Sequence, residues 1–132
     1  MKIPETAFLE QDFIRLKGID LEDSWLVGLE MDWETQRLTL FLDFSIWQPS
    51  EFYEKPKPGE WTCYKRGVLV FTNVRELIGL PDLANINPSV DPDGSMDWGN
   101  LEDFRIKNDW ISMELCDLEV RFKADEMIFR LE

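Results

Sequence analysis

Residues 25–47 read WLVGLEMDWETQRLTLFLDFSIW, and this stretch decides the fold. Large apolar side chains occupy every odd position from Trp25 to Trp33 and every even position from Leu38 to Ile46. In a β-strand, alternation with a period of two buries one face and leaves the other in water. The two halves therefore predict an antiparallel hairpin whose apolar side chains all share one face.

The polar residues between the two halves predict how the strands pair. Placing Glu34 opposite Arg37 leaves Thr35-Gln36 at the tip and sets Leu29 opposite Leu42. A slip of one residue would send half of the apolar side chains into water, so the pattern favours this register.

Strand patterns continue through the rest of the chain. Residues 61–74 predict a strand pair or one long bent strand, in which Gly67 indicates a bulge or a bend. The run Val68–Phe71 is apolar on both faces, which is typical of a central, covered strand. Four later strands are expected over residues 101–107, 110–115, 118–122 and 127–131, with a turn at Asn108-Asp109 and a bulge or a tight turn at Cys116-Asp117. The last two predict a hairpin that sets Phe122 against Met127.

Other stretches predict shorter elements and loops. A strand is expected near Asp12–Lys17, and a helical turn over Asn73–Leu80 that closes at Gly79. Two proline-containing stretches, residues 48–60 and 81–100, predict long loops.

Length and composition fit one folded domain over residues 1–132. The chain has 132 residues and is 44% hydrophobic, enough for a core of its own. We predict an all-β or β-dominated fold, an antiparallel meander of about seven or eight strands. Such a chain buries its apolar faces as a sandwich or a partly closed barrel, with room for one short helix.

Charge excludes several classes of function. With 14 basic and 27 acidic residues, the net charge is −13, which opposes binding to nucleic acids and to anionic membrane surfaces. The chain has no histidine, which removes Ser-His-Asp and Cys-His catalysis as well as histidine-ligated metals. No phosphate-binding or nucleophile motif is present, so we predict a protein that is not an enzyme and needs no cofactor.

The cytoplasm is the expected location. The sequence has neither an apolar run long enough to span a membrane nor a basic-then-apolar start typical of a secretion signal. Cys63 and Cys116 both lie in apolar, strand-like runs, which predicts two reduced and buried thiols. In an exported protein they could form one disulfide.

An acidic loop carries the most suggestive binding motif. Positions 1, 3, 5, 7 and 12 of an EF-hand calcium loop carry oxygen ligands. The equivalent residues here are Asp91, Asp93, Ser95, Asp97 and Glu102. The glycine stands at the fourth position instead of the sixth, and prolines replace the first helix. The other interpretation is an ordinary Asp-Pro-Asp-Gly turn in a solvated loop.

One segment resembles known proteins. Residues Cys63–Val74 contain the pattern Tyr-x-Arg-Gly-x-Leu-x-Phe-x-x-Val, with the Lys55–Glu60 loop before it and Met96-Asp97-Trp98-Gly99 after it. The pattern is similar to small uncharacterised bacterial proteins of about this length, which resemble immunity proteins of bacterial toxin systems in size and acidity. The resemblance implies a β-rich domain of unassigned role and assigns no site residues.

These observations predict a domain that acts by binding another protein. Its negative charge would complement a basic partner, of which a basic toxin is one example. The expected contact is an acidic face together with the loop aromatics Phe52, Tyr53 and Trp98. The alternative is a calcium- or small-ligand-binding module built on the Asp91–Glu102 loop. The sequence leaves the oligomeric state open.

Overall fold

The two alternating runs form a pair of long antiparallel strands, β2 (Ile19–Asp32) and β3 (Arg37–Ile46). The computed structural model describes residues 2–3, 18–48 and 50–132, so the strand expected near residues 12–17 lies outside the described residues. The even-numbered apolar side chains of β3 are all fully buried, as the period predicted: Leu38, Leu40, Leu42, Phe44 and Ile46.

The predicted register of this hairpin is wrong by two residues. Asp32, rather than Glu34, pairs with Arg37, and Leu29 pairs with Leu40 instead of Leu42. The tip is a turn over residues 33–36, so Trp33 is not part of the buried face and is 67% exposed. When the register shifts by two residues, the remaining side chains stay on the same face of the sheet. The alternation of apolar residues fits both registers and therefore could not distinguish them.

A turn-forming carboxylate explains the longer tip. The Asp32 side chain accepts hydrogen bonds from the backbone N–H groups of Glu34 and Thr35, at 3.0 and 3.3 Å. Gln36 completes the turn with a φ of 55°. Aspartate commonly bonds the backbone two residues further on, and this local bonding ends the strand early.

A bulge reverses the faces of β2 near its middle. The pairing with β3 shifts between Leu26 and Gly28, and one extra residue in a strand turns the following side chains to the opposite side. Leu26 is therefore fully buried, whereas Trp25 and Val27 are only half-buried. Trp25 pairs with Asp43 on the outward face, contrary to the prediction that it faces the core.

β2 and β3 belong to a five-stranded antiparallel sheet. Its order is β1 (Lys2–Ile3), β11 (Glu126–Leu131), β4 (Cys63–Thr72), β3 and β2. The central, covered position predicted for the Val68–Phe71 run is confirmed, and β4 is a single strand. Gly67 marks no bulge, because its pairing with Leu42 is regular. A Cβ atom at Gly67 would lie 2.5 Å from the carbonyl oxygen of Arg130, so a close backbone approach requires the glycine.

A four-stranded antiparallel sheet covers the first. Its order is β5 (Arg75–Ile78), β10 (Leu118–Lys123), β9 (Trp110–Leu115) and β8 (Glu102–Lys107). The predicted strands of this region are confirmed, and so are the tight turns between them. Asn108-Asp109 and Cys116-Asp117 adopt the left-handed φ values that two-residue hairpins need.

Two local predictions in this half of the chain are wrong. Residues 75–78 form β5 instead of a helical turn, because they pair with the edge of β10. Among the described residues, the helical segment is the 3₁₀ turn η3 (Leu83–Asn85). β10 and β11 form no hairpin, because the chain crosses from one sheet to the other at Ala124-Asp125 and β11 pairs with β4. Phe122 and Met127 are both buried but belong to different sheets.

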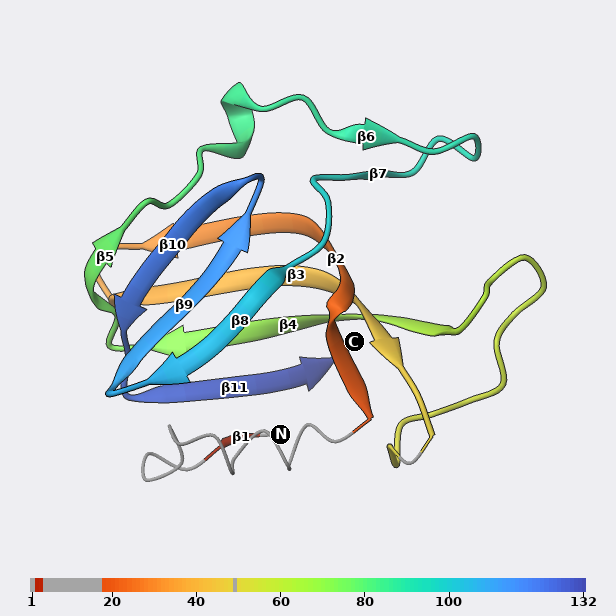
Figure 1. The fold of residues 1–132 in the computed structure, drawn as a ribbon, viewed down its shortest axis with the longest axis horizontal. Helices are drawn as coiled ribbons and strands as arrows, with labels where there is room; N and C mark the ends of the chain where they lie inside the picture. The colour runs from red at the N-terminus through yellow and green to blue at the C-terminus, as the bar shows by residue number, and fades with distance from the viewer. Residues whose placement is uncertain (1, 4–17, 49) are drawn as a thin grey trace.

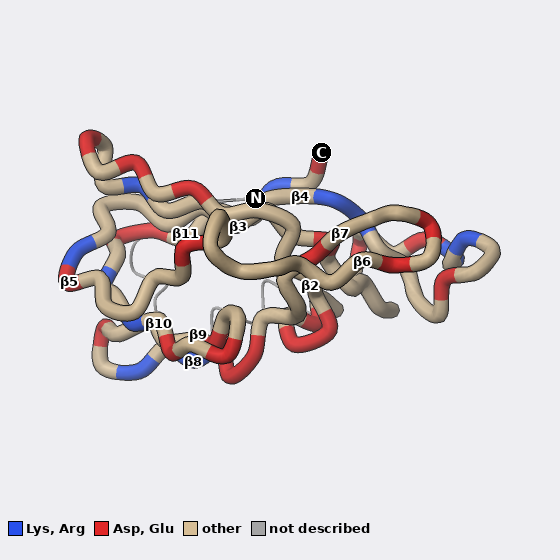
Figure 2. Tube along the Cα trace, turned by 90° about the horizontal axis from the view of Figure 1, so that it is seen from above, with Lys and Arg blue, Asp and Glu red and all other residues tan. Residues whose placement is uncertain are grey.

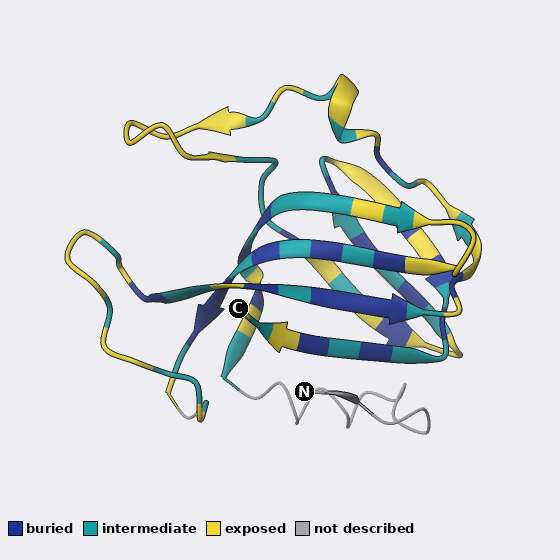
Figure 3. Ribbon diagram, turned by 180° about the vertical axis from the view of Figure 1, so that it is seen from behind, coloured by how far each residue is buried: buried dark blue, intermediate teal, exposed yellow. Residues whose placement is uncertain are grey.

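The two sheets form the two layers of a sandwich. Seen from above, the five-stranded sheet is the upper layer and the four-stranded sheet is the lower layer (Figure 2). Aromatic rings join the layers. The ring of Phe71 on β4 lies 4.9 Å from that of Phe122 on β10, edge to face, and 6.5 Å from that of Phe104 on β8. Along β3, buried residues alternate with half-buried ones from Leu38 to Phe44, whereas β4 is buried continuously from Leu69 to Phe71 (Figure 3). The β-dominated, sandwich-like fold is thus confirmed.

Two arms project from the same side of the sandwich (Figure 1). One is the loop between β3 and β4, and the other is the hairpin of β6 (Ser89–Val90) and β7 (Met96–Asp97). Residues 98–101, which follow β7, join the second arm to β2, where Leu26 and Gly99 share a backbone hydrogen bond of 2.8 Å. In the described part of the chain, no helix has the length and apolar character needed to cross a membrane.

Candidate functional site

A groove of about 710 Å³ lies between the β6–β7 hairpin and the outward face of the five-stranded sheet. We call it the acidic groove. Side chains from β2, β3 and β4 meet those of the hairpin there. Its lining comprises Trp25, Asp43, Glu60, Tyr64, Arg66, Ser89, Asp91, Asp93, Ser95, Met96 and Asp97.

Three neighbouring strands supply the sheet side of the acidic groove. Trp25, Asp43 and Arg66 pair in one row across β2, β3 and β4, so their side chains point outward together. The Arg66 guanidinium donates to both carboxylate oxygens of Asp43, from Nε at 2.5 Å and Nη2 at 3.3 Å. This paired contact raises the pKa of Arg66. Asp43 thus neutralises the charge of Arg66.

Hydrogen bonds hold an aromatic cluster beside this row. The Tyr64 hydroxyl donates to Asp23 Oδ2 at 3.1 Å and accepts from Trp61 Nε1 at 2.6 Å. The Trp61 ring lies 4.8 Å from that of Trp47, edge to face. Burial raises the pKa of Tyr64, so the hydroxyl keeps its proton at neutral pH. Trp61 is 66% exposed, which leaves a large aromatic surface in contact with water.

The tip of the β6–β7 hairpin bonds to itself. The Ser95 hydroxyl lies 2.6 Å from Asp93 Oδ1 and 3.2 Å from Asp91 Oδ2, and it can donate to only one of them at a time. The backbone N–H of Ser95 also donates to Asp93 Oδ1, at 2.9 Å. These hydrogen bonds lower the pKa of Asp93, so its carboxylate stays ionised. Asp97 accepts from the backbone N–H of Gly99 at 2.8 Å.

The structure separates the residues of the EF-hand-like pattern. Asp91, Asp93, Ser95 and Asp97 line the acidic groove, whereas Glu102 lies on β8 and lines a different pocket. A β-hairpin surrounds the loop, where an EF-hand has helices. Within the residues that the structure describes, no group of three or more His, Cys, Asp and Glu side chains is placed to hold a metal ion.

The predicted interaction aromatics pack against the protein itself. Phe52 and Tyr53 are half-buried against the core, and the Phe52 ring lies 5.7 Å from that of Phe129. Trp98 is half-buried too, and its Nε1 donates to the carbonyl oxygen of Ile86 at 3.0 Å. Instead of these three, Trp33 and Trp61 are the strongly exposed aromatics of the described chain.

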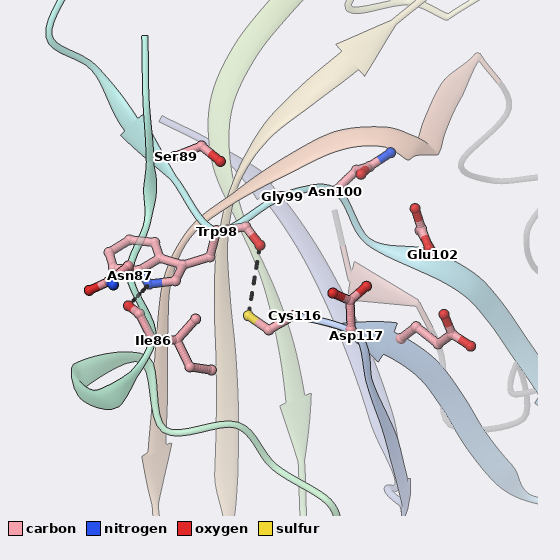
Figure 4. A pocket seen from close by; sticks show the side chains of 10 residues that line it. Ile86, Asn87, Ser89, Trp98, Gly99, Asn100, Glu102, Cys116 and Asp117 are labelled. Carbon is pink, nitrogen blue, oxygen red and sulfur yellow. Dashed lines mark hydrogen bonds between the residues drawn. The ribbon is translucent and has the colours of Figure 1, made fainter.

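A second, smaller pocket of about 280 Å³ contains Trp98 and Cys116 (Figure 4). The Cys116 thiol donates a weak hydrogen bond to the carbonyl oxygen of Trp98, with a sulfur-to-oxygen distance of 3.7 Å. Burial, with a smaller contribution from Asp117, raises the pKa of this thiol. A raised pKa keeps a cysteine protonated and poorly nucleophilic, so the pocket holds no activated thiol.

Sequence reasoning missed the row of Trp25, Asp43 and Arg66, because the β2 bulge that turns Trp25 outward was not predicted. A signal was present. Leu26 and Val27 are adjacent apolar residues, so either could have continued the buried face. Comparison of the chain with protein-family models, with curated proteins and with solved structures finds no match.

Proposed function

We propose that this protein is a non-enzymatic interaction domain that binds a basic segment of another protein in the acidic groove. The observation that carries the proposal is the composition of the groove. Five of its lining residues are carboxylic acids, Asp43, Glu60, Asp91, Asp93 and Asp97, and the one basic lining residue in the described chain, Arg66, is already paired.

The chemistry of the groove suits a lysine or arginine side chain. Carboxylates form strong, charge-assisted hydrogen bonds with ammonium and guanidinium groups. Trp25 and Tyr64 also line the groove, and aromatic rings of this kind attract cations. Trp61, beside Tyr64, offers further exposed aromatic surface.

The whole-chain charge supports the same partner. A net charge of −13 attracts a basic protein from a distance and raises the association rate more than the final affinity. The resemblance to immunity proteins is compatible with a basic toxin as that partner. We propose a cytoplasmic location, since Cys63 and Cys116 are both free thiols.

A defined probe can test the groove without knowledge of the natural partner. We would titrate the protein with a synthetic oligolysine peptide and follow backbone amide shifts by NMR. An oligolysine of the same length with acetylated side chains controls for contacts that do not need charge. The proposal expects shifts concentrated on β7, the 91–95 turn and the row of Trp25, Asp43 and Arg66, and none with the acetylated peptide.

Matched charge variants separate the groove from general attraction. Asp91→Asn with Asp93→Asn removes two groove charges and keeps acceptor oxygens for Ser95. Asp109→Asn with Asp117→Asn removes two charges from turns of the four-stranded sheet, at positions whose positive φ asparagine also accepts. We expect the groove variant to bind oligolysine about 5- to 30-fold more weakly, from roughly 1–2 kcal/mol for two ion pairs. If both double variants lost the same affinity for oligolysine, the binding would depend on net charge alone and the proposal would be overturned.

A further inference from the structure

The outward face of the four-stranded sheet carries charges of opposite sign in adjacent rows. Glu102, Glu114 and Glu119 pair directly across β8, β9 and β10 and form a glutamate row. An arginine row contains Arg105, Ser112 and Arg121, and it lies two residues further along β9 and β10 and three residues along β8, where the pairing shifts. Two residues along a strand span about 7 Å, so each row lies within reach of one long side chain from the other.

A third row extends the positive side. Lys107 pairs with Trp110, and the Lys123 ammonium lies 4.9 Å from the centre of the same indole ring. The Arg121 guanidinium lies 4.8 Å from it. The signs are therefore segregated along the strand direction, with glutamates towards the Cys116-Asp117 turn and cations towards the Asn108-Asp109 turn. Figure 2 shows this sheet as the lower layer, with residues of both signs along its strands and turns.

The glutamate row gives a single copy of the chain no stability. Like charges that face each other directly across neighbouring strands repel. Within the described residues, neither Glu102 nor Glu114 forms an ion pair, and Glu119 contacts Arg121 only at 3.8 Å. The other contact of the arginine row, from Arg105 to Asp103, is equally long at 4.0 Å. Both rows consequently keep most of their hydrogen-bonding capacity for an external group.

We propose that this face is a self-association surface, on which two copies of the chain stack in a two-fold dimer. The matching follows from the order of the rows. The two-fold axis runs parallel to the rows, between the glutamate row and the arginine row. Rotation by 180° about this axis reverses the strand direction, so the glutamate row of each copy faces the arginine row of the other. Glu102 then faces the partner's Arg105, Glu119 faces the partner's Arg121, and Glu114 faces the partner's Ser112. Symmetry doubles each of these contacts.

A second copy fits this face better than a uniformly charged partner does. The glutamate row would repel an anionic ligand, and the rows that contain the arginines and lysines would repel a cationic one. With signs nearly balanced here, two chains of net charge −13 meet where their mutual repulsion is smallest. Exposed ion pairs are individually weak, so the dimer is expected to be weak and concentration-dependent.

Charge reversal tests the pairing directly. Sedimentation equilibrium at physiological ionic strength, up to millimolar protein, measures the dissociation constant of the dimer. Glu119→Arg and Arg121→Glu each create like-charge contacts across the two-fold axis, so each should weaken the dimer by about tenfold or more. The double variant Glu119→Arg/Arg121→Glu restores opposite charges in both copies and should recover the dimer. A structural defect would not be repaired in this way.

The controls isolate the face. Arg130→Glu reverses an exposed charge on β11 of the other sheet and should leave the dimer intact. Thermal melts establish that every variant is folded. A wild-type chain that stays monomeric at every concentration would overturn the proposal, and so would a double variant that stays as weak as the single ones. The acidic groove lies on the other sheet, so its proposed function is tested separately.

Discussion

The Tyr64 hydroxyl is the centre of the aromatic cluster beside the acidic groove, and its removal has a calculable cost. Tyr64→Phe keeps the ring and deletes one donor and one acceptor. The lost bond to Asp23 is to a charged group and would contribute about 1.5–3 kcal/mol if fully buried. Asp23 is half-buried and keeps a bond of 2.8 Å from the Ser45 hydroxyl, so we take the lower part of that range.

The second lost bond contributes little. Trp61 is 66% exposed, so its N–H regains a hydrogen bond with water when the tyrosine oxygen is absent. The total expected decrease in the free energy of unfolding is therefore about 1–2 kcal/mol. Urea unfolding followed by tryptophan fluorescence measures it as a lower midpoint at an unchanged slope. The fluorescence of the folded state should also change, because Trp61 loses its fixed partner.

Tyr53→Phe is the matched control. Tyr53 is half-buried against the core, and in the described chain its hydroxyl makes no hydrogen bond to another residue. Its removal should cost less than about 0.5 kcal/mol, the usual size of a change that breaks no specific contact. Equal costs for the two variants would refute the inference that Tyr64 connects Asp23 to Trp61.

Further predictions address titration, packing, backbone strain and calcium. Burial holds the pKa of Tyr64 above its ordinary value of 10.0, so the unfolded chain ionises first. The free energy of unfolding should therefore fall as the pH rises above that value, and urea midpoints should show less of this fall in Tyr64→Phe. Phe122→Ala removes a fully buried ring between the sheets and should cost about 3–5 kcal/mol by urea unfolding. Gly79→Ala should lower the melting temperature more than Gly94→Ala: both glycines have positive φ, but only at Gly79 would a Cβ collide with a backbone oxygen of β10. Millimolar calcium should leave the melting temperature unchanged, because the described chain places no group of three or more acidic side chains to hold the ion, and a clear rise would contradict this.

The sequence predicted the elements whose structure depends only on residues within the element itself. The strict alternation of β3 identified its buried face, and the asparagine and aspartate pair at Asn108-Asp109 identified a tight hairpin turn. Both signals are local, since they depend on strand period and on turn conformation. The bounds of β9, Trp110–Leu115, agree with the prediction for the same reason.

Elements determined by distant partners were not predictable. Residues 75–78 contain helix-forming side chains, but pairing with β10 makes them a strand. The register of β2 depends on the local Asp32 turn and on a bulge; alternation alone locates neither, although the adjacent apolar residues Leu26 and Val27 allowed for the bulge. The acidic groove depends on that bulge and on the β6–β7 hairpin, so its residues appeared in the sequence only as separate loop aspartates and strand aromatics.

The strand order of the larger sheet has a consequence for folding speed. β4 pairs with β11, and Thr72 and Glu126, which bond across this pair, are 54 positions apart in the chain. Closing so large a loop costs chain entropy before any contact repays it, and all-β proteins rich in such distant contacts fold in milliseconds to seconds. Until β11 pairs with β4, the apolar edge of β4 is open to other chains. Refolding at high protein concentration should therefore compete with aggregation.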